Sequence, residues 1–187
     1  MSFEIAVLVG SLRANSNSSH IANAIETVAP ATLKFRRLPI GDLPIYNEDF
    51  DGDKAPASYT SFRAGIAQAD AVLFITPEYN RSVPGGLKNA IDVGSRPYGK
   101  GALIGKPAAI ISSSPGPIGG FGSNHAIRQS LVFLNMPVLQ QPEAYLGHIK
   151  SSFDDAGRLT SESLKNLLSN FIAAFEQLIA QSKSKEK

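Results

Sequence analysis

Cysteine is absent from the 187 residues of this chain, and long apolar runs are absent as well. Without cysteine, the chain can form no disulfide bond, no thiolate metal site and no cysteine nucleophile. No uncharged apolar run approaches the roughly 18 residues that a membrane-spanning helix requires, and the N-terminus lacks a basic segment followed by a long apolar core. We therefore expect no membrane span and no signal peptide, which favours a cytoplasmic location.

An excess of charge of one sign is also missing. The formal net charge is +2, and the basic residues are scattered apart from those at 183, 185 and 187. This balance is too small to indicate a nucleic-acid partner. The hydrophobic share of 43% and the charged share of 18% are ordinary for a globular protein. The length predicts a single domain over 1–187 with a full core, and residues 182–187 are expected to form a disordered tail.

Short apolar segments alternate with segments of helical periodicity. Right-handed crossovers between such strands produce a doubly wound parallel α/β sheet with helices on both faces. The second strand mixes apolar and basic residues, as an edge strand does, whereas the first and third are the most apolar. The expected five-stranded order is therefore 2-1-3-4-5, in a three-layer αβα architecture. The predicted strands are Phe3–Val9, Leu33–Leu38, Ala71–Thr76, Pro107–Ser113 and a last one beginning at Pro137–Leu139, and the predicted helices are His20–Val28, Ser58–Ala69, one after Pro84, Ala126–Asn135 and one carrying the apolar stripe Leu164–Ile179.

The loop after the first strand has the composition of a phosphate site. Gly10–Ser19 is rich in hydroxyls and amides and carries one cation, Arg13, just before a helix. Hydroxyl groups and unpaired N–H groups at a helix N-terminus bind anions, and the helix dipole favours them. Neither a Walker loop nor the G-x-G-x-x-G dinucleotide pattern is present. The loop therefore favours a terminal monophosphate, with a well-capped Asn/Ser-rich turn as the alternative.

Two further loops are expected at the same edge of the sheet. Pro77–Arg81 follows the third strand, with Ser82 expected to cap the next helix and Pro84 to lie in its first turn. Ser114–Asn124 is rich in glycine, which lets backbone approach a flat ligand. In order 2-1-3-4-5 these loops converge on a crevice that FMN is known to occupy in this topology. A capped turn with an exposed polar tip is the alternative for the second loop. The apolar cluster Leu43–Tyr46 is expected to pack on the body of the protein.

Three motifs, in order along nearly the whole chain, resemble the NAD(P)H-dependent FMN reductase family, and its chromate- and quinone-reducing branch in particular. They are G-S-L-R-x-x-S from Gly10, T-P-E-Y-N-x-S-x-P-G-x-L-K-N-A-I-D from Thr76, and S-S-x-G-x-x-G-G from Ser113, followed by I-R-Q-S-L-V-F-L. The resemblance implies a flavodoxin-like fold with bound FMN, and NADPH or NADH as co-substrate. It implies two-electron, ping-pong hydride transfer to quinones, free flavin or related acceptors, extending to chromate and azo compounds. It also implies a homodimer or homotetramer.

The resemblance further implies which residues hold the cofactor. The phosphate would be held from the first loop, the isoalloxazine ring would be framed by the second, and the third would close its other side. In that order the residues are Ser11, Arg13, Ser16, Asn17 and Ser18; Pro77, Glu78, Tyr79 and Asn80; and Ser113, Ser114, Gly116 and Gly119.

No catalytic side chain and no metal ligand is assigned, because in such enzymes the flavin carries the chemistry and the protein supplies position and electrostatics. The three histidines are interpreted as surface residues. Relatives often carry aromatic residues where this chain has Arg81 and Val93. Two other functions stay open: a flavodoxin-type one-electron carrier, which is expected to be acidic whereas this sequence has a pI of about 8.9, and a flavin-based redox sensor without turnover.

Overall fold

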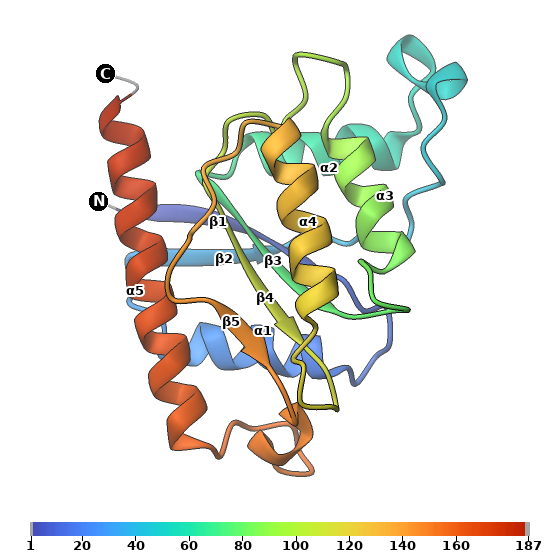
Figure 1. The fold of residues 1–187 in the computed structure, drawn as a ribbon. Coiled ribbons are helices and arrows are strands. Elements are labelled where there is room, and N and C mark those ends of the chain that lie inside the picture. The colour runs from blue at the N-terminus through green and yellow to red at the C-terminus, as the bar shows by residue number, and fades with distance from the viewer. Residues whose placement is uncertain (1, 186–187) are drawn as a thin grey trace.

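The computed structural model describes residues 2–185 and contains a five-stranded parallel sheet in the order β2-β1-β3-β4-β5 (Figure 1). The expected order and the flavodoxin-like fold are therefore confirmed. No helix within these residues combines the length and apolar character needed to cross a membrane. The strands are β1 (Phe3–Val9), β2 (Leu33–Arg37), β3 (Ala71–Pro77), β4 (Ala108–Ser113) and β5 (Ala144–Leu146).

Helices cover both faces of the sheet, as the alternating pattern predicts (Figure 1). One face packs against two helices and the other against three, so that two apolar clusters flank the strands. The first pair is α1 (Asn17–Val28) and α5 (Glu162–Lys185); the other three are α2 (Ala57–Ala67), α3 (Gly85–Gly94) and α4 (Phe121–Phe133). Short 3₁₀ turns lie at Glu48–Phe50, Gly52–Lys54 and Ile149–Ser152.

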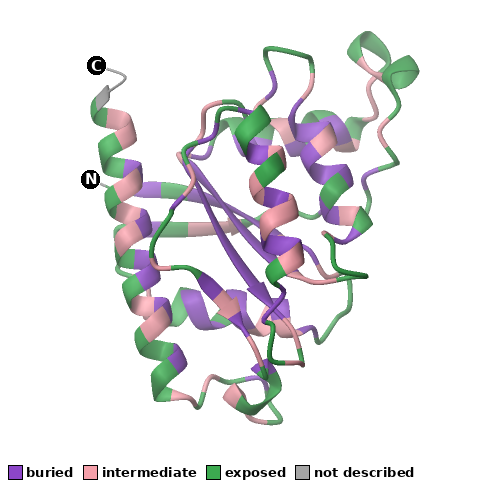
Figure 2. Cartoon of the chain, viewed as in Figure 1, coloured by how far each residue is buried: buried purple, intermediate pink, exposed green. Residues whose placement is uncertain are grey.

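The central strands are buried on both faces (Figure 2). In β3, Leu73 and Ile75 point into the cluster beneath α1 and α5, whereas Val72 and Phe74 point into the cluster beneath the other three helices. Side chains alternate across a strand, so an uninterrupted apolar run supplies both clusters at once. Each fully buried side chain of this size stabilises the fold by about 1.5–3 kcal/mol.

The predicted start of the last strand at Pro137–Leu139 is wrong. Val138 forms one isolated bridge to Ala108, and the ladder resumes only at β5. Pro137 and Pro142 have no N–H to donate, which limits pairing on either side of this segment. The two prolines therefore interrupt the pairing with β4 between Val138 and β5, and the apolar pattern of the segment does not indicate this interruption.

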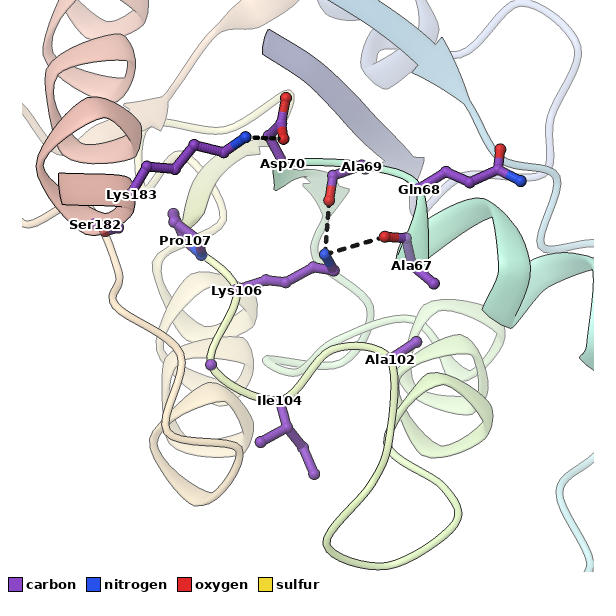
Figure 3. A pocket seen from close by; sticks show the side chains of 11 residues that line it. Ala67, Gln68, Ala69, Asp70, Ala102, Ile104, Lys106, Pro107, Ser182 and Lys183 are labelled. Carbon is purple, nitrogen blue, oxygen red and sulfur yellow. Dashed lines mark hydrogen bonds and ion pairs between the residues drawn. The ribbon is translucent and has the colours of Figure 1, made fainter. Parts of the chain in front are cut away.

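The disordered tail expected over 182–187 is wrong for Ser182–Lys185, which continue α5; residues 186–187 lie outside the described part of the chain. Lys183 forms an ion pair with Asp70 (Figure 3). The Asp70 carboxylate also accepts the N–H of Glu4 at 2.8 Å. Beside this pair, a cavity of about 460 Å³ opens at the amino edge of the sheet. One of its lining residues, Lys106, donates from Nζ to the Ala69 carbonyl at 2.6 Å. The ion pair between Lys183 and Asp70 thus holds the last turn of α5 against the residue that precedes β3.

The long loop between β2 and α2 is held down by polar contacts on α3. Asn89 donates to the carbonyls of Leu43 and Pro44 and accepts the N–H of Tyr46 at 2.8 Å. The expectation that Leu43–Tyr46 packs on the body is therefore confirmed for Leu43, which is buried, and is wrong for Ile45, which is 80% exposed.

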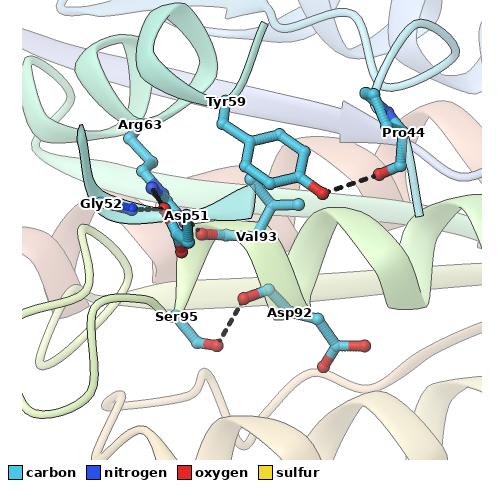
Figure 4. Close-up of polar contacts among 8 residues, drawn as sticks. All are labelled: Pro44, Asp51, Gly52, Tyr59, Arg63, Asp92, Val93 and Ser95. Atoms are coloured by element: carbon cyan, nitrogen blue, oxygen red, sulfur yellow. Dashed lines mark hydrogen bonds and ion pairs between the residues drawn. The ribbon is translucent and has the colours of Figure 1, made fainter. Parts of the chain in front are cut away.

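A partly buried ion pair closes the same loop over α2 (Figure 4). Arg63 donates two hydrogen bonds of 2.7 Å to the carboxylate of Asp51, and a third of 2.8 Å to the carbonyl of Val93. The hydrogen bonds from Arg63 lower the pKa of Asp51 to about 2. Tyr59 donates to the Pro44 carbonyl at 3.1 Å, and burial raises its pKa.

Candidate functional site

Three loops leave the sheet side by side at its carboxyl edge. The β1–β3 register pairs Val9 with Ile75, and the β3–β4 register pairs Pro77 with Ser113. The N–H of Gly10 donates to the Ile75 carbonyl at 2.8 Å. A Cβ at position 10 would lie 2.9 Å from the Leu87 side chain, so glycine is what lets the first loop turn this closely over β3. The convergence expected from the topology is present.

The first loop ends in a capped helix with an unsatisfied hydroxyl. Ser16 is the N-cap of α1 and accepts the N–H of Ser19 at 3.1 Å. The helix begins at Asn17, three residues before the predicted start, which places Asn17 and Ser18 in its first turn, where N–H groups have no intrahelical partner. Ser18 Oγ is buried, with the residue 1% exposed, and has no hydrogen-bond partner among the described residues.

An orphaned hydroxyl of this kind costs about 1–3 kcal/mol. A phosphate oxygen at the helix N-terminus would supply the missing acceptor, and the helix dipole would favour its charge. The donor set of this turn therefore fits an anion.

The first two loops enclose a cavity of about 270 Å³. It brings together Arg13 and Tyr79, both expected site residues, and Tyr79 is 49% exposed. A Cβ at Gly85 would meet no atom within 4 Å, so this wall is open. Ser11 lines a neighbouring cavity of about 370 Å³ instead. Five other residues line the cavity of about 270 Å³ and were not expected from the sequence: Gly10, Leu12, Pro84, Gly85 and Gly86. The Pro-Gly-Gly step at the start of α3 was the available signal for the last three.

The second loop is a strained hairpin turn. The backbones of Tyr79 and Ser82 exchange two hydrogen bonds of 3.0 Å. Between them, Asn80 and Arg81 both have positive φ, at 50° and 65°. The expectation that Ser82 caps the helix is wrong, because this pairing occupies its backbone and Pro84 is the N-cap of α3. Consecutive left-handed residues other than glycine are uncommon and cluster at functional sites.

Glu78 is directed at a helix end. Its Oε2 accepts the N–H groups of Gly122 and Ser123 at 2.7 and 3.2 Å, and its Oε1 pairs with Arg81 at 3.2 Å. The side chain is 10% exposed. The N-cap of α4 is Gly120, which has no side chain to offer, so Glu78 supplies the missing cap from another loop. The structure thus places Glu78 under the turn as a support.

The third loop is fastened to itself and to β5. Ser114 Oγ accepts the Gly119 N–H at 3.0 Å and donates to the Gly116 carbonyl at 2.9 Å. A Cβ at Gly119 would lie 2.4 Å from the backbone of Tyr145, whereas one at Gly116 would meet nothing within 4 Å. Ser113 is buried at the end of β4. Gly116 therefore stands at the open side of the loop, and Gly119 packs beneath it.

His125, expected to be a simple surface residue, belongs to an aromatic cluster beside this loop. Its Nε2 lies 3.0 Å from Tyr145 Oη, and its ring lies 4.1 Å from that of Phe121. Tyr145 donates to Glu143 at 2.7 Å, and burial, with Glu143 adding to it, raises the pKa of Tyr145 to about 12. The cluster braces the β4–α4 loop from the β5 side.

This chain is similar to known proteins in both sequence and fold. The family model described as "NADPH-dependent FMN reductase" matches residues 3–151. A quinone reductase of Pseudomonas putida is 55% identical over 173 residues, 92% of each chain. A 2-hydroxy-1,4-benzoquinone reductase of a Burkholderia species is 42% identical, covering 92% of this chain and 93% of that one. The solved structure of a flavoenzyme NAD(P)H:(acceptor) oxidoreductase from Paracoccus denitrificans superposes with a TM-score of 0.90 at 40% identity, covering 96% and 98% of the two chains.

Proposed function

This chain belongs to the NADPH-dependent FMN reductase family, and we propose that it is an oxidoreductase that uses NADPH or NADH to reduce quinones and free flavin with FMN as its cofactor. The family resemblance of the three motifs is confirmed. The observation that carries the proposal is the juxtaposition, at one sheet edge, of a helix N-terminus holding the orphaned Ser18 hydroxyl and a cavity lined by Arg13 and Tyr79.

The residues of the three loops fit both the phosphate and the ring of FMN. We assign the phosphate to Ser18, to the first turn of α1 and to the Arg13 guanidinium, with Ser11, Ser16 and Asn17 around them. The β3–α3 turn and the backbone at Gly116 and Gly85 would receive the ring. Both glycines face open space, because a Cβ at either position would meet no atom within 4 Å. When bound, FMN supplies the ring that accepts a hydride equivalent from the nicotinamide and passes two electrons to the acceptor.

The protein's own contribution is position and electrostatics. Glu78 holds the turn of Tyr79 against α4, and Thr76 Oγ1 lies 2.9 Å from Ser123 Oγ, a second tie between the same elements. Tyr79 offers a half-exposed aromatic face beside the cavity. No side chain is assigned a covalent role. We propose ping-pong turnover, in which the nicotinamide leaves the site before the acceptor enters.

We also propose that the active form is a homodimer or homotetramer. The cavity is bounded by two loops and the start of α3, and Tyr79 at its wall is 49% exposed, so a second subunit is expected to cover a bound ring. One folding domain over 1–187 and a cytoplasmic location, where NAD(P)H is regenerated, complete the proposal.

The test is cofactor analysis followed by turnover. The released chromophore of the denatured protein should be FMN, at about one per chain. The loaded protein should oxidise NADPH or NADH only when an acceptor such as 1,4-benzoquinone is present, with parallel double-reciprocal plots. Recovery of FAD, or no flavin after incubation with FMN, would overturn the cofactor. Bound FMN without quinone-dependent oxidation would identify a carrier or a sensor. Light scattering at micromolar concentration tests the assembly, and a fully active monomer would exclude it.

A further inference from the structure

Arg81 lies in the β3–α3 turn, two residues after the cavity-lining Tyr79, in a backbone conformation that arginine rarely adopts. Its φ is 65°, in the left-handed region, and it follows Asn80 in the same region. Asparagine tolerates this conformation, whereas for a long side chain it costs about 1 kcal/mol or more. The turn leaves the Arg81 side chain 73% exposed. Strain of this kind, kept at a ligand-binding edge, points to a function of the side chain.

Arg81 shares its acidic partner, Glu78, with the end of a helix. Its partner Glu78 already accepts two N–H groups from the first turn of α4, whose dipole is positive at that end. Arg13 adds a second cation at the cavity. Lys88, on α3, is paired with Asp92 at 2.8 Å. Its one ion pair leaves most of the Arg81 side chain exposed, so the guanidinium keeps N–H groups that can donate outward.

We propose that Arg81 is a specificity-determining residue that recognises an anionic oxygen on a substrate, and we assign that substrate as an acceptor quinone with an ionised hydroxyl group beside its carbonyl. This inference rests on the proposed function. Hydroxyquinones of this type are vinylogous acids and are anions at neutral pH. They present two adjacent oxygens, and the planar fork of a guanidinium donates to such a pair with two N–H groups. A neutral quinone offers no such pair.

Three variants separate charge from backbone geometry. Arg81→Asn removes the charge and suits the positive φ of the turn, and Arg81→Lys keeps the charge without the fork. Lys165→Met is the matched control, because Lys165 is also an exposed cation in an (i, i+3) ion pair but lies on α5. The probes are 2-hydroxy-1,4-naphthoquinone and 1,4-naphthoquinone. Each variant is compared with the wild type on the same probe, so the different reduction potentials of the two quinones cancel.

The readouts are the dissociation constant of each quinone for the FMN-loaded protein, measured by calorimetry without nicotinamide, and kcat/KM in turnover. Arg81→Asn should weaken binding of the hydroxyquinone about 5- to 30-fold, as expected for the loss of a charge-assisted contact at a partly exposed site. Binding of 1,4-naphthoquinone should change less than about two-fold, as for surface changes elsewhere. Arg81→Lys should recover part of the preference, and Lys165→Met should alter neither quinone.

Equal losses on both quinones would overturn the inference and give Arg81 a purely structural role in the turn. The 2′-phosphate of NADPH is another anion that a guanidinium can recognise, so NADP⁺ and NAD⁺ are titrated in parallel. A loss confined to NADP⁺ would overturn the assignment to the acceptor and place the nicotinamide phosphate at Arg81. Failure of the wild type to oxidise NADPH or NADH with any quinone would instead overturn the proposed function, which keeps the two failures distinct.

Discussion

Replacing Ser18 by alanine is expected to stabilise the FMN-free protein and to weaken FMN binding at the same time. Ser18 Oγ is buried without a hydrogen-bond partner among the described residues, so removing it relieves a desolvation penalty in the absence of ligand. Once a phosphate lies at the first turn of α1, the same hydroxyl becomes a donor to an anion. The one substitution therefore changes the two states in opposite directions.

The magnitudes follow from these two roles. Removing the unsatisfied hydroxyl should add about 1 kcal/mol to the free energy of unfolding, and a few tenths more come from the better helix propensity of alanine. For a domain of this size that raises Tm by about 2–4 °C. Losing a hydrogen bond to phosphate should raise the dissociation constant of FMN about 10- to 150-fold. At saturating FMN this removes about 1.4–3 kcal/mol of ligand stabilisation, so the Tm of the loaded variant should fall below that of the loaded wild type.

The assay is thermal unfolding of the FMN-free, FMN-loaded and riboflavin-loaded protein. Riboflavin lacks the phosphate, so with it the variant should keep its Tm advantage. Ser16→Ala is the matched control, two residues away: it removes the N-cap hydrogen bond to Ser19 and should lower the free energy of unfolding by about 0.5–2 kcal/mol, and with it the Tm, in every state. A Ser18→Ala variant that is destabilised without ligand, or that loses FMN and riboflavin equally, would refute the assignment of Ser18 to the phosphate.

Three further predictions test the supports of the site. Because hydrogen bonds from Arg63 lower the pKa of Asp51 from 3.8 to about 2, the pair stabilises the fold above about pH 4 and this contribution is lost as the pH falls through about 2; urea unfolding from pH 6 to 2 should show a flatter profile for Asp51→Asn. Glu78→Ala should destabilise by about 1–3 kcal/mol, because two N–H groups of α4 lose their acceptor; Glu78→Gln, which keeps an oxygen there, should lose less in the same denaturant titration. Asn89→Ala should lower stability by about 2–4 kcal/mol, because three backbone groups of the β2–α2 loop lose their partner; increased proteolysis confined to that loop would show that the clamp, not the core, has failed.

The sheet could be predicted because its signal is carried by many residues at once. The run from Ala71 to Ile75 is buried at every position. An unbroken apolar strand of that kind is typical of the middle of a parallel sheet, where both faces are covered. The basic residues of Leu33–Arg37 mark the edge in the same way. The order 2-1-3-4-5 depends on the apolar and basic character of whole segments, so an unusual residue at one position does not change it.

The errors fall where one local contact outweighs a pattern. A disordered tail is expected at the end of α5, but Lys183 forms an ion pair with Asp70, 113 positions away in the chain. Ser82 has the chemistry of a helix cap, but it pairs with Tyr79 across a turn whose positive φ angles fall on an asparagine and an arginine instead of glycine. Neither interaction leaves a trace in composition or periodicity, because each depends on a partner that only the folded chain supplies.

The two halves of the candidate site differ in how far the fold orders them before a ligand binds. The β3–α3 turn is tied to α4 through Glu78 and through Thr76, so its geometry is set by the fold before any ligand arrives. Arg13, by contrast, is exposed and makes no hydrogen bond to the described residues. Ordering a long side chain on binding consumes about 0.5–1.5 kcal/mol of the interaction that it makes. The ring end should therefore fix where a flavin sits, while the phosphate end, through Ser18 and Arg13, decides how tightly it is held and which flavin is accepted.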